Sequence, residues 1–254
     1  DRYVNGVDYF ALDHDEGQFD GYLKRYGTFA GTGITSFRMP SNLQYIAPET
    51  FRNCEQLKTF YIGKAFRGKI NYGEEGDPDT LFLYYAPIRL IQIDKENTSY
   101  QLQNEILYTR DGHILCQALK NDNADSQLTI PSCVTEIADG AFYRNSEFGA
   151  IEVKGSLERI GISAFACADV GSFYVKGGVN YLDRGSFYQS AISEWRCHGG
   201  VKKYEKSAFQ DVDATNGYAI DMNAITKLYQ ELLYVNATTD LSYWVKTIWN
   251  WITM

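Results

Sequence analysis

One short phrase of the sequence recurs at a nearly constant distance along the chain. It consists of an apolar residue, a few spacers, a small residue and a phenylalanine, as in "TEIADGAFYR" (135–144) and "ERIGISAFAC" (158–167). The last four of its five copies are separated by 23, 22 and 22 residues, and the copies align on Phe51, Phe142, Phe165, Phe187 and Phe209. A fixed period in the twenties predicts a solenoid, because each coil is too small to bury its own apolar face and must stack on its neighbours.

A pair of apolar residues follows each repeated phenylalanine at a similar offset. The pair lies 9 and 11 residues after Phe51 and Phe142, and 8 and 10 residues after Phe165 and Phe187. Because side chains alternate between the two faces of a strand, this spacing predicts a short β-strand with two core-facing residues. The predicted rungs of one narrow parallel sheet are Phe37/Met39, Phe60/Ile62, Ile91/Ile93, Leu128/Ile130, Ile151/Val153, Phe173/Val175, Trp195/Cys197 and Tyr218/Ile220. The repeated phenylalanine would lie in a short helical turn on the opposite wall, with its ring in the core between coils.

Two segments interrupt the period and predict insertions. The stretch 67–80 is rich in Gly, Asp and Pro, which indicates a surface loop. The longer stretch, 97–125, contains "EILYTRDGHILC" (105–116), in which Asp111-Gly112 separates two apolar runs. An Asp-Gly pair in this position predicts a β-hairpin.

Charge and hydropathy exclude several classes of protein. The chain of 254 residues has a net charge of −8 and no basic patch, so we expect no nucleic-acid partner. No run of 18 apolar residues exists, so we expect no membrane-spanning segment. The sequence begins at Asp1 rather than Met, and we expect a processed or trimmed product whose signal or anchor is absent from this chain.

The sequence lacks the residue patterns of an enzyme or a metal centre. The three histidines have no Ser or Cys nucleophile at the spacing of a catalytic triad, and we expect no catalytic residue, no metal and no cofactor. Sequons for N-glycosylation stand at Asn97-Thr98-Ser99 and Asn236-Ala237-Thr238. The cysteines form no CxxC pair and are interpreted as partly buried thiols, with one bridge between neighbouring coils left open as an alternative. They are Cys54, Cys116, Cys133, Cys167 and Cys197.

The spelling of individual units resembles a known repeat family. "LTIPSCVTEIADGAFYR" (128–144) resembles the unit of the BspA-type leucine-rich repeat, and "MPSNLQYIAPETFRNCEQLKTFYI" (39–62) matches nearly the whole unit. The insert at 97–125 is similar to the hairpin insert of the family, with Asn104-Glu105 where the family usually has Asp-Gly. Residues 3–23 look like the opening hairpin cap of the family, and 233–254 look like its closing strand and short helix.

The resemblance implies a mainly β leucine-rich-repeat solenoid that covers residues 1–254 as a single domain. Its expected parts are a hairpin N-cap at 1–34, repeats at 35–220 that carry the two inserts, and a short helical C-cap at 221–254. It also implies a secreted or cell-surface protein, most often from a host-associated bacterium, with relatives that are discussed as adhesins. Fold-level likeness alone does not establish a function.

The alternation of the predicted strands indicates which side chains face away from the core. Tyr and Arg are frequent interface anchors, so the outward rows are the candidate binding surface. The candidate residues are Arg38, Tyr61, Gln92, Glu152, Lys154, Tyr174, Lys176, Arg196 and His198. An ordinary solvated sheet is the alternative interpretation of the same rows.

Two functions from different classes fit these observations. We expect a non-catalytic recognition or adhesion protein that binds an extracellular or host protein, or a glycan, through the sheet face or the inserted loops. The alternative is a structural spacer of a surface assembly with no specific ligand. A contiguous exposed Tyr/Arg patch would favour recognition, and scattered charges would favour the spacer.

Overall fold

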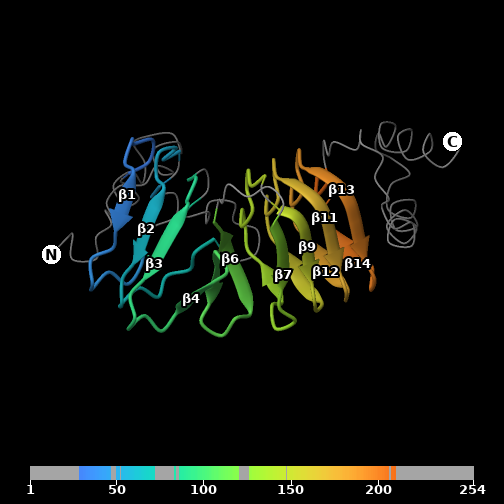
Figure 1. Cartoon of the computed structure of the whole chain (residues 1–254), viewed down its shortest axis with the longest axis horizontal. Coiled ribbons are helices and arrows are strands. Elements are labelled where there is room, and N and C mark those ends of the chain that lie inside the picture. The colour runs from blue at the N-terminus through green and yellow to red at the C-terminus, as the bar shows by residue number, and fades with distance from the viewer. Residues whose placement is uncertain are drawn as a thin grey trace, which may run out of the picture.

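Parallel strands from successive coils build the walls of the molecule, as the computed structural model shows (Figure 1). The structure describes residues 29–46, 50–51, 53–71, 83, 86–119, 126–146, 148–205 and 207–209. Sheet A contains β1 (Ser36–Arg38), β2 (Thr59–Ile62) and β3 (Leu90–Ile93). Sheet C contains, in spatial order, β7 (Ser126–Ile130), β9 (Phe148–Val153), β11 (Asp169–Val175) and β13 (Ala191–Cys197).

The rungs pair in the register that the sequence predicts. In sheet A, Phe37 pairs with Phe60 and Phe60 with Ile91. In sheet C, the partners in register are Leu128, Ile151, Phe173 and Trp195. The single continuous ladder that the sequence indicated is instead divided in two, because the inserted hairpin separates β3 from β7. The predicted rung Tyr218/Ile220 lies outside the described residues.

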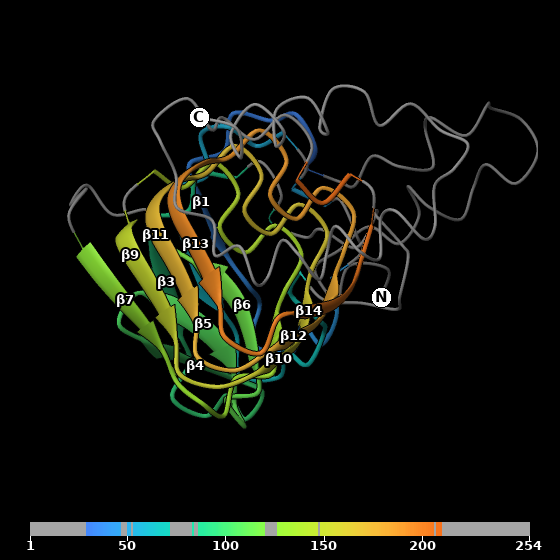
Figure 2. The ribbon, with the colours of Figure 1, turned by 90° about the vertical axis from the view of Figure 1, so that its right-hand side faces the viewer.

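A second wall, which the sequence analysis did not predict, places a strand before each of Phe142, Phe165, Phe187 and Phe209, and these four strands pair parallel. Sheet B runs in the order β14 (Val201–Tyr204), β12 (Val179–Leu182), β10 (Leu157–Ile160), β8 (Glu136–Ile137), β6 (Ile114–Ala118), β5 (Ile106–Thr109) and β4 (Tyr100–Gln103). Leu157, Val179 and Val201 are partners in register and are all buried. Seen along the array, sheets C and B meet at a corner (Figure 2). Buried residues of both sheets pack in one hydrophobic cluster.

The third side of each coil, which holds the repeated phenylalanine, forms hydrogen-bonded turns. No helix is present in the described residues, so the helical turns that the sequence predicted are not found. A left-handed residue stands two positions before and two positions after Phe142, Phe165 and Phe187, and such a residue cannot continue a right-handed helix. These residues are Gly140 and Arg144, Ser163 and Cys167, and Gly185 and Gln189.

The turns of neighbouring coils are joined to each other by backbone hydrogen bonds. The Phe142 N–H donates to the Ala164 carbonyl, and the Phe165 N–H donates to the Ser186 carbonyl, each at 2.7 Å. In a helix these amides would point along their own segment toward the residue four positions earlier. Here they point to the next coil, so this side of the array is a ladder as well.

The repeated phenylalanines form a column of stacked rings inside the array. The centroids of Phe142 and Phe165 are 4.6 Å apart, those of Phe165 and Phe187 5.0 Å, and those of Phe187 and Phe209 5.1 Å, with nearly parallel planes. Phe142, Phe165 and Phe187 are completely buried. The column confirms the prediction that this ring fills the space between coils.

The inserted hairpin divides the core into two hydrophobic clusters. As the Asp111-Gly112 signal predicted, β5 and β6 pair antiparallel, and β6 then pairs parallel with β8. Ile106, Tyr108 and Leu115 pack in the cluster of the C-terminal coils. Their neighbours Leu107 and Cys116 pack in the cluster of the N-terminal coils. A strand pair that is buried on both faces explains the nearly continuous apolar runs on either side of the turn.

Several predicted features fall partly or wholly on residues outside those described. Of the predicted N-cap, the structure describes 29–34, and there the Phe29 ring stacks on Phe51 with centroids 5.5 Å apart. Because Phe29 lies 22 residues before Phe51, it holds the position of a repeat phenylalanine. The C-cap at 221–254 and residues 72–80 of the first insert lie outside the described residues.

Removing one ring of the phenylalanine column should weaken the whole C-terminal half. For Phe165→Ala we expect a loss of about 3–5 kcal/mol in the free energy of unfolding, because a fully buried ring and both of its stacking partners lose their contacts. Urea unfolding followed by circular dichroism measures this loss. The control is Leu102→Ala in β4, where the side chain is 38% exposed and the expected loss is below about 1 kcal/mol. Equal losses in both variants would contradict the stacking account.

Candidate interaction surface

The outer face of sheet C gathers six of the nine candidate binding residues. Glu152, Tyr174 and Arg196 are partners in register on β9, β11 and β13, between rung residues that point into the core. The next positions along the chain are Lys154 and Lys176, followed on the third coil by His198. Successive backbone hydrogen bonds, from the Lys176 N–H to the Val153 carbonyl and from the His198 N–H to the Val175 carbonyl, keep these positions aligned.

Side-chain contacts organise this surface into two connected rows. The Tyr174 ring meets the His198 imidazole edge to face, with centroids 5.4 Å apart. The Glu152 carboxylate lies between two lysines: it is 3.3 Å from the Lys176 Nζ and forms an ion pair and hydrogen bond with Lys154. The hydrogen bond from Lys154, assisted by Lys176, lowers the pKa of Glu152. One carboxylate is therefore shared by two ammonium groups.

Arg196 has an acidic neighbour on its own strand that the sequence analysis did not single out. Arg196 forms an ion pair with Glu194, and its side chain keeps an exposed fraction of 55%. Glu194 is in register with Ser172, two positions before the row of Tyr174 and Arg196. Because side chains alternate between the two faces of a strand, the position of Glu194 two residues before Arg196 predicts that both lie on the same face.

The remaining three candidate residues lie on sheet A and form a separate group. The Arg38 guanidinium carbon is 3.9 Å from the centroid of the Tyr61 ring, and the Tyr61 hydroxyl donates to Asp94 Oδ2 at 2.7 Å. This hydrogen bond raises the pKa of Tyr61, while the Glu96 N–H and the Tyr61 hydroxyl lower the pKa of Asp94. Gln92 is in register with Tyr61 and exposed. The nine predicted residues thus form two surfaces, because sheets A and C are not continuous.

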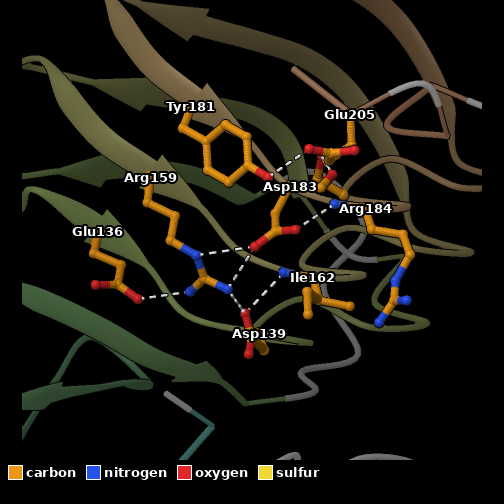
Figure 3. A network of polar contacts seen from close by, with 9 residues as sticks. Glu136, Asp139, Arg159, Ile162, Tyr181, Asp183, Arg184 and Glu205 are labelled. Carbon is orange, nitrogen blue, oxygen red and sulfur yellow. Dashed lines mark hydrogen bonds and ion pairs between the residues drawn. The ribbon is translucent and has the colours of Figure 1, made fainter. Parts of the chain in front are cut away.

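The outer face of sheet B carries a network of charges that the sequence analysis missed (Figure 3). The Arg159 guanidinium donates to Glu136 at 2.8 Å, to Asp139 at 2.5 Å and to Asp183 at 2.9 and 3.2 Å. Asp139 also accepts the Ile162 N–H at 2.7 Å. Because the three carboxylates come from the coils before and after that of Arg159, the network ties three coils together.

A glycine makes room for the most buried carboxylate of this network. A Cβ atom at Gly161 would lie 2.3 Å from Asp139 Oδ1, so any larger residue would displace the carboxylate. Burial raises the pKa of Asp139 to about 6, and the Asp183 charge adds to this effect, although Arg159 and the Ile162 N–H favour the ionised form. Burial alone disfavours the charged guanidinium, but the carboxylates outweigh it and raise the pKa of Arg159.

The sequence contains a signal for this network in the same period as the phenylalanines. Glu136, Arg159, Tyr181 and Lys203 follow one another at intervals of 23, 22 and 22 residues and are partners in register. Lys203 lies over the Tyr181 ring, with its Nζ 4.7 Å from the centroid, and the Tyr181 hydroxyl donates to Glu205. Arg159 is only 16% exposed, against 49% for Lys176 on sheet C. The polar groups of this row on sheet B are engaged with neighbouring coils, whereas sheet C presents its cations to solvent.

The described residues contain no group of three His, Cys, Asp or Glu side chains that could hold a metal ion. No helix in the described part of the chain is long and apolar enough to cross a membrane. The five cysteines, which all lie in described coils, form no disulfide. Asn97 of the first sequon is 3% exposed, and its amide donates to the Gly63 and Phe66 carbonyls, so this asparagine is closed to glycosylation in the folded protein. The second sequon, at Asn236, lies outside the described residues.

Comparison with known proteins gives a family and a similar fold. The family model described as "BspA type Leucine rich repeat region" matches six copies, over residues 25–72 and 112–216. No curated protein matches the chain. The crystal structure of the pneumococcal vaccine antigen PcpA is similar with a TM-score of 0.50 and 14% identity, covering 79% of this chain and 66% of that one, slightly less than two thirds. A leucine-rich repeat protein from Eubacterium ventriosum has a TM-score of 0.39 and 16% identity, covering 74% of this chain and 67% of that one.

The carboxyl group of Asp139 should make stability depend on pH. Its pKa in the folded state, about 6, lies above the ordinary value of 3.8, so the folded protein binds the extra proton. The stabilisation of the folded state by this proton is complete below about pH 4 and is lost as the pH rises through 6. Between pH 5 and 7.5 we expect the free energy of unfolding of the wild type to fall by about 1 kcal/mol more than that of Asp139→Asn. Urea unfolding at both pH values measures this difference. The same pH dependence in both proteins would show that Asp139 is ionised throughout.

Proposed function

Since the chain belongs to the BspA-type leucine-rich-repeat family, we propose that it is a non-catalytic recognition or adhesion protein, secreted or displayed at the cell surface. Its partner is an extracellular or host protein, or a glycan. Solenoids of this kind offer an extended wall rather than a closed pocket, and partners bind along that wall. The likeness to a pneumococcal vaccine antigen is one of fold and agrees with a location outside the cell.

The observation that carries this proposal is the composition of the outer face of sheet C. Tyr174 and Arg196 are neighbours in register, and the Lys154, Lys176 and His198 row lies beside them. Tyr and Arg are enriched among residues that dominate binding energy, and a rigid backbone lowers the entropy cost of binding. The parallel ladder fixes the backbone positions of these residues before any ligand arrives.

A spacer without a specific ligand is the second candidate, and one observation favours it. Glu152 and Glu194 form ion pairs with the cations of the same face, as charges on an ordinary solvated sheet do. The hairpin offers a third location, since Leu102 on β4 is an exposed apolar residue. Mutations confined to sheet A, to sheet C or to the hairpin discriminate among these possibilities.

The proposal is tested by screening the purified protein against extracellular-matrix proteins and a glycan array. The test variant is Tyr174→Ala/Arg196→Ala on sheet C, and the matched control is Arg38→Ala/Gln92→Ala on sheet A. For a ligand found in the screen, we expect the sheet C variant to raise the Kd at least about tenfold and the sheet A variant to change it less than about threefold. Binding that survives both variants would move the site to the hairpin, and no saturable binding would support the spacer.

A further inference from the structure

Three successive coils each place one nitrogen-bearing side chain directly after the strand of sheet C. Lys154 follows Val153, Lys176 follows Val175 and His198 follows Cys197, and these three strand residues are partners in register. Neighbouring rungs are about 4.8 Å apart, so the row runs along the axis of the array and across the strands. That repeat is close to the rise of one pyranose unit in an extended glycan chain.

The row keeps a positive charge although carboxylates lie nearby. Lys154 and Lys176 share the single Glu152 carboxylate, which leaves one positive charge on this trio. Arg196 and Glu194 balance each other. An anionic ligand is therefore complementary to this row.

An aromatic ring and a strip without side chains lie on either side of the cations. Tyr174 is partly exposed and contacts His198, and an aromatic face of this kind packs on the apolar face of a sugar ring. On the other side, Gly155, Gly177 and Gly199 follow the row. A Cβ atom at Gly177 would lie 2.8 Å from the Gly155 carbonyl oxygen, so close stacking of the coils keeps this strip bare. These three glycines leave a strip without side chains beside the row.

We propose that this row binds an acidic polysaccharide whose chain lies across the strands of sheet C. Lys154 and Lys176 pair with anionic groups of this chain, His198 donates a hydrogen bond at the third rung, and the Tyr174 ring packs on a sugar. The inference deepens the proposed recognition function and rests on it, because it names the ligand class for the same face. Sulfate and carboxylate groups share the required chemistry, and the experiment distinguishes them.

The test measures equilibrium binding of the full chain to three probes of similar length: a heparin oligosaccharide, a hyaluronan oligosaccharide and poly-glutamate. The variant Lys154→Gln/Lys176→Gln removes two charges from the row. The control Lys58→Gln/Lys95→Gln removes two charges from the coils of sheet A that are also exposed. We expect the first to raise the glycan Kd at least about tenfold and the second less than about threefold, with thermal midpoints unchanged.

A further variant, Tyr174→Leu, removes the ring without changing charge and should weaken glycan binding at least about threefold. Binding of heparin alone supports a sulfated ligand, and binding of hyaluronan supports a carboxylated one. The inference is overturned if neither glycan binds, if both double variants lose affinity equally, or if poly-glutamate binds as tightly as the glycans and Tyr174→Leu has no effect. If a host protein is still bound through Tyr174 and Arg196, the proposed function stands while this inference fails.

Discussion

Contact between consecutive coils is the constraint on which the rest of this molecule depends. A coil of 22 or 23 residues cannot enclose a core, so every apolar side chain relies on the coil before and the coil after it. The structure meets this requirement on three sides at once, with parallel rungs in sheets B and C and with backbone bonds between the turns that hold Phe142, Phe165 and Phe187. The stacked rings fill the space that these three ladders enclose.

The same contacts explain why one outer face is suited to recognition. On sheet B, Arg159 and its three carboxylates join neighbouring coils and are largely withdrawn from solvent. On sheet C, the side chains that alternate with the rungs are held at a regular spacing but remain partly or fully exposed. A ligand that repeats along its length can therefore meet equivalent positions on successive coils without ordering any loop.

Periodicity alone predicts much of the fold and part of the candidate surface. The phenylalanine period and the in–out–in pattern of Phe60/Ile62 or Ile151/Val153 identify the rungs, because burial acts at every copy. The second wall was missed because its strands, such as Leu157–Ile160, are short and have two polar residues between two apolar ones, a pattern that does not alternate. The turns were predicted to be helical, and left-handed residues such as Ser163 and Arg144 are not evident from their side chains. The division of the nine candidate residues between two sheets depends on how the β5–β6 hairpin packs, and no local pattern encodes that.

Native-state hydrogen exchange of the Phe165 and Phe187 amides tests most directly whether coil-to-coil hydrogen bonding fixes all sides of the array. Both amides donate to the next coil, to the Ser186 and Ala208 carbonyls. We expect them to exchange as slowly as the hydrogen-bonded amides of β11, with the same free energy of opening, since one set of neighbours protects both walls. Fast exchange at these two amides, with slow exchange confined to the strands, would contradict the account.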